Sequence, residues 1–252
     1  MNPLTSSLGR ALGRWLSRER HVHSTSPPTA SDLLAATLRP ADVLLVEGRT
    51  RVSVAIKFLT QSTWSHAALY VGDCGGSCAP HCFVEADIVE GVRLVGLEHF
   101  AGLHCRICRP VGLSDDDCRR VVEFALARVG YQYDLRNVID LVRYLIPTPP
   151  VPQRWRRRML ALGSGDPTRA ICSTLVAQSF QSVRYPILPH IETRPATGGG
   201  CPDCVDEILH VRHHSLFVPR DFDVSPYFEV IKPTLAQGFD YHRLNWAEEK
   251  AA

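Results

Sequence analysis

Three residues far apart in the sequence have the types that nucleophilic catalysis through a thiol requires: Cys172, His66 and Glu85. Such catalysis needs a thiolate, an imidazole that holds and later returns a proton, and a third group that orients the imidazole. A thiolate forms most readily at a helix N-terminus, where N–H groups and the helix dipole lower its pKa. Cys172 fits, because a Gly- and Pro-bearing loop at 163–167 precedes it and apolar residues of a predicted helix follow it.

His66 begins the clearest predicted strand, Ser65 to Gly72, in which alternation places every second residue on the face of His66. Glu85 lies in the next predicted strand, Cys82 to Ala86. If the two strands form an antiparallel hairpin, the two side chains lie side by side or diagonally. A carboxylate there fixes the tautomer of the imidazole. Taken singly, each residue has a plain structural explanation, and Cys172 is then a small buried helix residue.

The surrounding elements form a sheet followed by helices. The strands are predicted at 43–46, 65–72, 82–86, 92–97 and 104–109, and the helices at 51–59, from a Ser114 cap to Gly130, 134–145, 155–162 and 171–180. Strand signals dominate the first half of the domain and helix signals follow, which is typical of an α+β protein.

The chain has 252 residues, of which 45% are hydrophobic and 21% charged, as in a soluble protein with one sizeable core. We expect one domain at 40–252, with an N-terminal extension and linker at 1–39 and a Gly- and Pro-rich insertion near 190–204. Leucines and arginines recur at helical spacing in residues 4–20. These residues predict a basic amphipathic helix that either lies on an anionic membrane surface or docks on its own domain.

The composition argues against several classes of function. A formal net charge of +2 is too small to indicate nucleic acid binding across the whole surface. No stretch reaches the roughly 18 uninterrupted apolar residues of a membrane-spanning helix, and residues 1–30 lack the pattern of a secretory signal. We therefore expect a cytoplasmic protein, with membrane association through residues 4–20 as an open alternative.

Nine cysteines are many for a protein in a reducing compartment, where free thiols are the default. Two C-x-x-C pairs, Cys105 with Cys108 and Cys201 with Cys204, are weak candidates for zinc ligands. However, residues 109–200 separate the pairs, far more than in a zinc ribbon, and the first pair lies in a predicted strand. We expect no metal and no cofactor, and a zinc-stabilised interaction protein remains the alternative.

Four segments in order resemble landmarks of the YiiX-like branch of permuted NlpC-type cysteine hydrolases. They are Thr-Trp-Ser-His-Ala-Ala-Leu-Tyr-Val-Gly at 63–72, Val-Glu-Ala at 84–86, Gly-Tyr-Gln-Tyr-Asp at 130–134 and Ile-Cys-Ser-Thr-Leu-Val at 171–176. An opening strand at Ala41 to Leu45 also matches. In that branch the His and acid strands precede the nucleophile helix, as they do here, whereas papain-like enzymes begin with the Cys.

The resemblance implies an α+β, circularly permuted papain-like fold, with a small antiparallel sheet packed against the Cys-bearing helix. It implies Cys172 as nucleophile, His66 as general base and acid, and Glu85 as orienting group. In that family the turn that bears Tyr131 and Tyr133 lies near the cleft.

A hydroxyl of Tyr131 or Tyr133 then donates to an oxyanion or binds substrate, or else each ring packs against a helix start. Ser173, next to the nucleophile, is a further candidate for oxyanion or substrate binding. Relatives often carry an acidic residue after the nucleophile, so the Ser here implies a different local tuning of the thiol pKa.

The implied reaction is attack of a thiolate on an amide or ester carbonyl, then release by water or another acceptor. The implied substrate is a small molecule, a peptide or an acyl lipid, because permuted relatives act on both amides and lipids. The segment 184–214 and the basic N-terminal helix depart from the shared pattern and are candidates for setting the substrate or location. A non-catalytic binding module on the same scaffold is the rival hypothesis.

Overall fold

The structure is a computed structural model that describes residues 18, 26–76, 80–132, 171–195, 205–236 and 238–243. Several predictions fall outside these residues: the helices at 134–145 and 155–162, Tyr133, the Cys201 and Cys204 pair, and all but residue 18 of the amphipathic segment 4–20. No helix among the described residues is long and apolar enough to cross a membrane.

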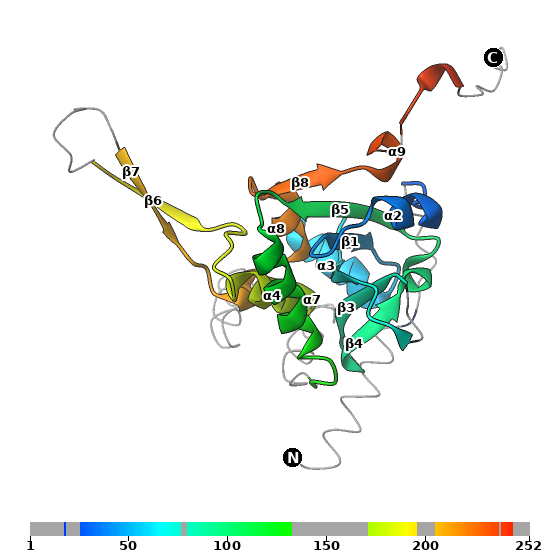
Figure 1. The fold of residues 1–252 in the computed structure, drawn as a ribbon, viewed down its shortest axis with the longest axis horizontal. Coiled ribbons are helices and arrows are strands. Elements are labelled where there is room, and N and C mark those ends of the chain that lie inside the picture. Colours follow the sequence, from blue (N-terminus) through cyan, green and yellow to red (C-terminus); the bar gives the residue numbers. More distant parts are fainter. Residues whose placement is uncertain are drawn as a thin grey trace, which may run out of the picture.

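A six-stranded sheet, antiparallel at every pairing, lies at the centre of the fold, in the order β4-β3-β2-β1-β5-β8 (Figure 1). The strands are β1 (Val43–Glu47), β2 (His66–Gly72), β3 (Cys82–Asp87), β4 (Gly91–Gly96), β5 (His104–Pro110) and β8 (Phe228–Ile231). The first five follow one another in the N-terminal half of the chain, and β8 joins the edge of β5 from the C-terminal end. The five predicted strands are confirmed, with ends that differ by at most one residue.

Alternation along β2 divides the core between the two faces of the sheet, as the sequence predicts. Ala67 and Leu69 belong to the apolar cluster that contains α7 (Ile171–Gln181), whereas Ala68 and Tyr70 belong to the cluster on the other face. The second cluster is closed by Leu34 of α2 (Ser31–Thr37) and Phe100 of the 3-10 helix η2 (Leu97–Phe100).

Helix α7 packs its apolar side against the sheet, and α4 (Asp115–Leu126) lies beside it (Figure 1). The Ser114 side chain accepts the backbone N–H of Asp117 and so caps α4, as predicted. Short elements complete the described fold: α3 (Arg51–Thr60), η3 (His214–Leu216), α8 (Pro219–Val224), α9 (Pro233–Ala236) and η4 (Tyr241–Arg243). The α+β class, with an antiparallel sheet packed against the Cys-bearing helix, is thereby confirmed.

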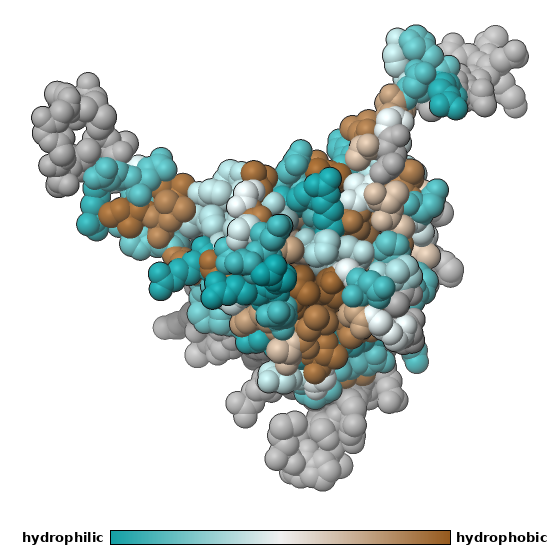
Figure 2. Space-filling view, viewed as in Figure 1, coloured by the Kyte–Doolittle hydropathy of each residue, from teal (hydrophilic) through white to brown (hydrophobic). Residues whose placement is uncertain are grey.

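Two features were not expected from the sequence. Helix α2 precedes the domain boundary suggested at residue 40, yet it packs on the sheet through Leu34, and the Thr29 N–H bonds the Leu103 carbonyl. Strands β6 (His190–Pro195) and β7 (Val205–His210) flank the Gly- and Pro-rich segment and form an arm that projects from the body (Figure 1). Apolar side chains gather on this arm (Figure 2).

A buried ion pair joins the start of β1 to β5. The Asp42 carboxylate accepts hydrogen bonds from Nε and Nη2 of Arg109 at 2.9 and 2.7 Å and from the Arg39 N–H at 2.8 Å. The Asp42 side chain is 1% exposed and that of Arg109 17%. The same Nη2 also donates to the Thr37 carbonyl at the end of α2, so the pair ties α2 to the sheet.

Candidate active site

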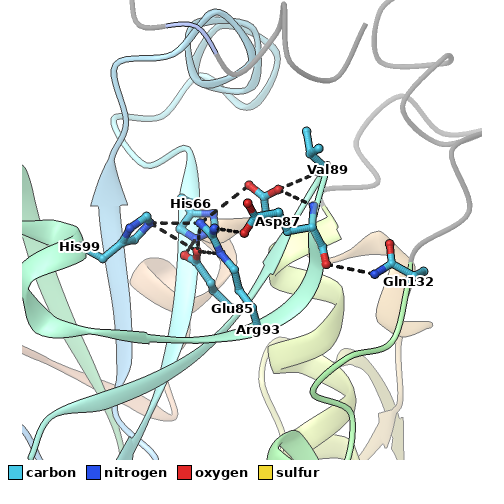
Figure 3. A network of polar contacts seen from close by, with 8 residues as sticks. His66, Glu85, Asp87, Val89, Arg93, His99 and Gln132 are labelled. Atoms are coloured by element: carbon cyan, nitrogen blue, oxygen red, sulfur yellow. Dashed lines mark hydrogen bonds and ion pairs between the residues drawn. The ribbon is translucent and has the colours of Figure 1, made fainter. Parts of the chain in front are cut away.

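His66 and Glu85 meet on neighbouring strands (Figure 3). His66 Nε2 lies 2.7 Å from Glu85 Oε2. Tyr70 pairs with Phe83 in the β2–β3 register, so continuing that register places His66 diagonal to Glu85. The Glu85 side chain is 2% exposed and that of His66 25%, so the carboxylate is shielded while the imidazole still reaches the surface.

Cys172 reaches the same imidazole from the helix. It lies at the start of the described part of α7 and is 5% exposed. Its thiol is hydrogen-bonded to the His66 side chain and to the backbone N–H groups of Ala67 and Ser173. Because His66 Nε2 is engaged by Glu85, Nδ1 is the ring nitrogen left for the thiol. The structure thus brings together the three residues that the sequence singled out.

The electrostatics of the three groups favour an ion pair. Burial alone would lower the pKa of His66, but the negative charges of Cys172 and Glu85 raise that pKa well above its usual value. Burial alone would raise the pKa of Cys172, but the His66 charge and the hydrogen bonds lower it. Burial also opposes ionisation of Glu85, but His66 holds the pKa of that carboxyl well below its ordinary range. A thiolate beside an imidazolium is the form in which a cysteine attacks a carbonyl.

Glu85 has two further partners that the sequence analysis missed (Figure 3). Arg93 donates to Glu85 Oε1 through Nε at 2.9 Å and Nη2 at 2.7 Å, and His99 Nε2 lies 3.3 Å from the same oxygen. Arg93 is directly opposite Glu85 in the β3–β4 ladder. The sequence held a signal for this contact. Gly91, with φ +78°, closes a three-residue turn between β3 and β4, and this turn fixes the register that places Arg93 opposite Glu85.

The network continues into the β3–β4 turn. Arg93 Nη1 also donates to Glu90, and its Nη2 lies 4.0 Å from Asp87. The Gln132 side chain donates to the Glu90 carbonyl at 3.2 Å (Figure 3). The Val92 N–H donates to the Tyr131 carbonyl at 2.9 Å. These bonds fasten the β3–β4 turn to the segment that follows α4.

The other candidate substrate-binding residues lie in different settings. Tyr131 is 62% exposed, and its backbone bonds join it to Arg128 just after α4 and to Val92 of β4. The Ser173 hydroxyl is buried and donates to the Phe217 carbonyl at 2.6 Å, so it fastens α7 to the segment after η3. Its N–H, rather than its hydroxyl, is directed to the Cys172 thiol. Tyr133 lies outside the described residues.

The C-x-x-C pair on β5 is divided between the two faces of the sheet. Cys105 belongs to the cluster under α2 and Cys108 to the cluster under α7, because residues three apart in a strand point in opposite directions. The two thiols therefore do not share one ion. Among the residues that the structure describes, no group of three or more His, Cys, Asp or Glu side chains is arranged to hold a metal.

Comparisons with known proteins agree with this architecture. Residues 37–144, which include His66 and Glu85 and end before Cys172, match the family described as permuted papain-like amidase enzymes, YaeF/YiiX. The chain is 20% identical over 204 residues to the probable lipoprotein peptidase YaeF of Escherichia coli K12, covering 74% of this chain and 71% of that protein.

The crystal structure of the metalloprotein yiiX from Escherichia coli O157:H7 is similar over 77% of this chain and 96% of that chain, with a TM-score of 0.46 and 15% identity. The family match and the order of the His strand, the acid strand and the Cys helix agree with the expected permuted papain-like fold. Residues 37–144 thus resemble the permuted papain-like amidase family that includes YaeF and YiiX.

Proposed function

We propose that the protein is a cysteine amidase in which Cys172 is the nucleophile, His66 the general base and acid, and Glu85 the residue that orients His66. One observation carries the proposal: the contacts that run from the Cys172 thiol through His66 to the buried Glu85 carboxylate. The three groups come from α7, β2 and β3, three elements that a structural role would not require to converge on one imidazole.

The proposed reaction has two halves. The Cys172 thiolate attacks the carbonyl carbon of the substrate, and the His66 imidazolium gives its proton to the nitrogen of the leaving amine as the C–N bond breaks. Neutral His66 then takes a proton from water, whose oxygen attacks the thioester. Breaking the C–S bond releases the acid and the thiolate and leaves His66 protonated again. Backbone N–H groups at the start of α7 are the proposed donors to the oxyanion.

We propose a peptide-like amide as the substrate class. The family is described as amidase, and the relative YaeF is named a probable lipoprotein peptidase, which supports an amide over an ester. Ester hydrolysis, an acyl-lipid substrate and transfer to an acceptor other than water are the alternatives. The membrane-surface argument for a lipid rests on residues 4–20, of which the structure describes only Arg18.

The test is site-resolved alkylation. Native protein is treated with limiting iodoacetamide across pH 4 to 9 and each cysteine is mapped by mass spectrometry, in the wild type and in His66→Ala. We expect Cys172 to react well below the pKa of about 8.5 of an ordinary thiol, and only when His66 is present. Cys118→Ala is the matched control, since this partly exposed thiol lies on α4 and its pKa is raised by burial.

Matched amide and ester substrates with the same acyl group then separate the reaction classes. Cys172→Ala should abolish turnover of the true substrate, and Cys118→Ala should retain it. A Cys172 that reacts like the other thiols, with no dependence on His66, would remove the chemical basis of the proposal and favour a binding module.

A further inference from the structure

The proposed triad does not explain why Arg93 is hydrogen-bonded to Glu85. Arg93 stands opposite Glu85 in the β3–β4 ladder, and both of its contacting nitrogens bond the same oxygen, Oε1. We propose that Arg93 is a positioning residue for the reaction: it fixes the Glu85 carboxylate so that Oε2 faces His66 throughout the catalytic cycle. This inference rests on the proposed function.

The two carboxylate oxygens of Glu85 have different partners, and this difference is the geometric basis of the proposal. Oε1 receives Arg93 at 2.9 and 2.7 Å, and Oε2 receives His66 Nε2 at 2.7 Å. A planar guanidinium presents its N–H donors in a rigid fork, so two bonds to one oxygen restrict rotation of the carboxylate. Lysine at this position would supply the charge as a single mobile point, without the fork.

The charge of Arg93 matters because His66 changes its own charge during the reaction. When His66 is neutral, a carboxylate that is only 2% exposed would face no cation on the His66 side. Burying an unpaired carboxylate is costly, and such a group takes up a proton instead. Arg93, bonded to Glu85 at both stages, keeps the carboxylate ionised and able to accept from His66.

His99 is a less suitable candidate for this role. Its Nε2 lies 3.3 Å from Glu85 Oε1 and 3.5 Å from Arg93 Nη2, both longer than the Arg93 bonds, and its side chain is 43% exposed. It comes from η2, outside the β3–β4 ladder. We assign the positioning to Arg93, which the register of the hairpin holds in place.

The experiment measures alkylation of Cys172 against pH in Arg93→Met, Arg93→Lys, Glu85→Gln and the Glu85→Gln/Arg93→Met double variant. Without the Arg93 cation, the buried Glu85 carboxylate is more readily protonated, and a neutral Glu85 no longer supports the imidazolium that stabilises the thiolate. Arg93→Met should therefore slow alkylation at pH 6 by about tenfold and move the midpoint to higher pH. Arg93→Lys restores the charge without the fork, so its midpoint should lie between those of the wild type and Arg93→Met.

The double variant decides whether Arg93 acts through Glu85. In the Glu85→Gln background, Arg93→Met should cause little further loss, since residues that act as a unit are not additive. Arg109→Met, which breaks another ion pair at the opposite end of the sheet, is the control for general destabilisation and should leave the midpoint unchanged.

The outcomes are distinguishable. A wild-type midpoint in Arg93→Met, or an equal loss with and without Glu85, overturns the positioning role while the triad stands. An ordinary, His66-independent thiol in the wild type overturns the proposed function, and this inference with it. Circular dichroism of each variant checks its fold. If Arg93→Met does not fold, a raised midpoint in Arg93→Lys supports the positioning role and a wild-type midpoint overturns it.

Discussion

Replacing Arg109 by Met tests how the sheet is held together away from the candidate site. The substitution keeps most of the apolar stem of the side chain. Asp42, 1% exposed, loses both hydrogen bonds from Arg109 and keeps the one from the Arg39 N–H. Removing one partner of a buried ion pair costs about 3–5 kcal/mol, because a charge is left uncompensated. We expect that loss in the free energy of unfolding at pH 7, a large part of a typical total of about 5–15 kcal/mol.

The assay is urea unfolding followed by tryptophan fluorescence, with Asp42→Asn and the double variant Asp42→Asn/Arg109→Met beside the single one. Removing the charge of Asp42 removes its penalty, so the double variant should recover at least about 2 kcal/mol over Arg109→Met. Asp42→Asn alone should cost less than Arg109→Met, because Arg109 is 17% exposed and reaches water. A loss under about 1 kcal/mol in Arg109→Met, or no recovery in the double variant, would refute the reasoning.

Two further predictions concern buried groups near the two faces of the sheet. Burial opposes ionisation of Glu85, but His66 and His99 hold its pKa below the ordinary value, so its stabilisation is present above about pH 4.3 and declines as the pH falls further. The stability gap between wild type and Glu85→Gln should be about 3 kcal/mol at pH 7 and shrink on acidification, measured by urea unfolding. Burial raises the pKa of Cys105 to about 12 and raises that of Cys108 as well, so both should escape iodoacetamide in native protein and react once it unfolds. Labelling of either thiol in folded protein at about pH 8.5 would contradict the buried placement.

Much of the fold follows from local patterns in the sequence. Alternation along 66–72 fixes which residues of β2 face each core cluster, and the apolar run at 43–46 predicts the fully buried β1. The Ser114 cap and the acidic first turn mark the start of α4. The contact between His66 and Glu85 could be anticipated as well, since neighbouring antiparallel strands place such residues side by side or diagonally.

The missed features depend on strand register and on contacts between segments, which single-segment patterns do not specify. Arg93 becomes a partner of Glu85 only through the register of β4, and His99 only because η2 returns the chain to the same carboxylate. Helix α2 is seven residues long, too short for a helical period to be recognised, and it is stabilised by burying Leu34 rather than by its own propensity. The spacing of Cys105 and Cys108 likewise suggests ligands, whereas strand geometry separates the two thiols.

The order of the three site residues along the chain has a consequence for biosynthesis. The strands that carry His66 and Glu85 are made before the helix that carries Cys172, and α7 packs directly onto those two strands. A chain still short of residue 171 thus contains the imidazole and the carboxylate without the sulfur, and lacks the helix that covers one face of its sheet. Domains fold as units during synthesis, so α7 delivers the thiol together with its part of the core, and β8 joins the sheet afterwards. A nascent or truncated chain therefore has no activated thiol at this site, and a reactive Cys172 reports that the sheet has been covered.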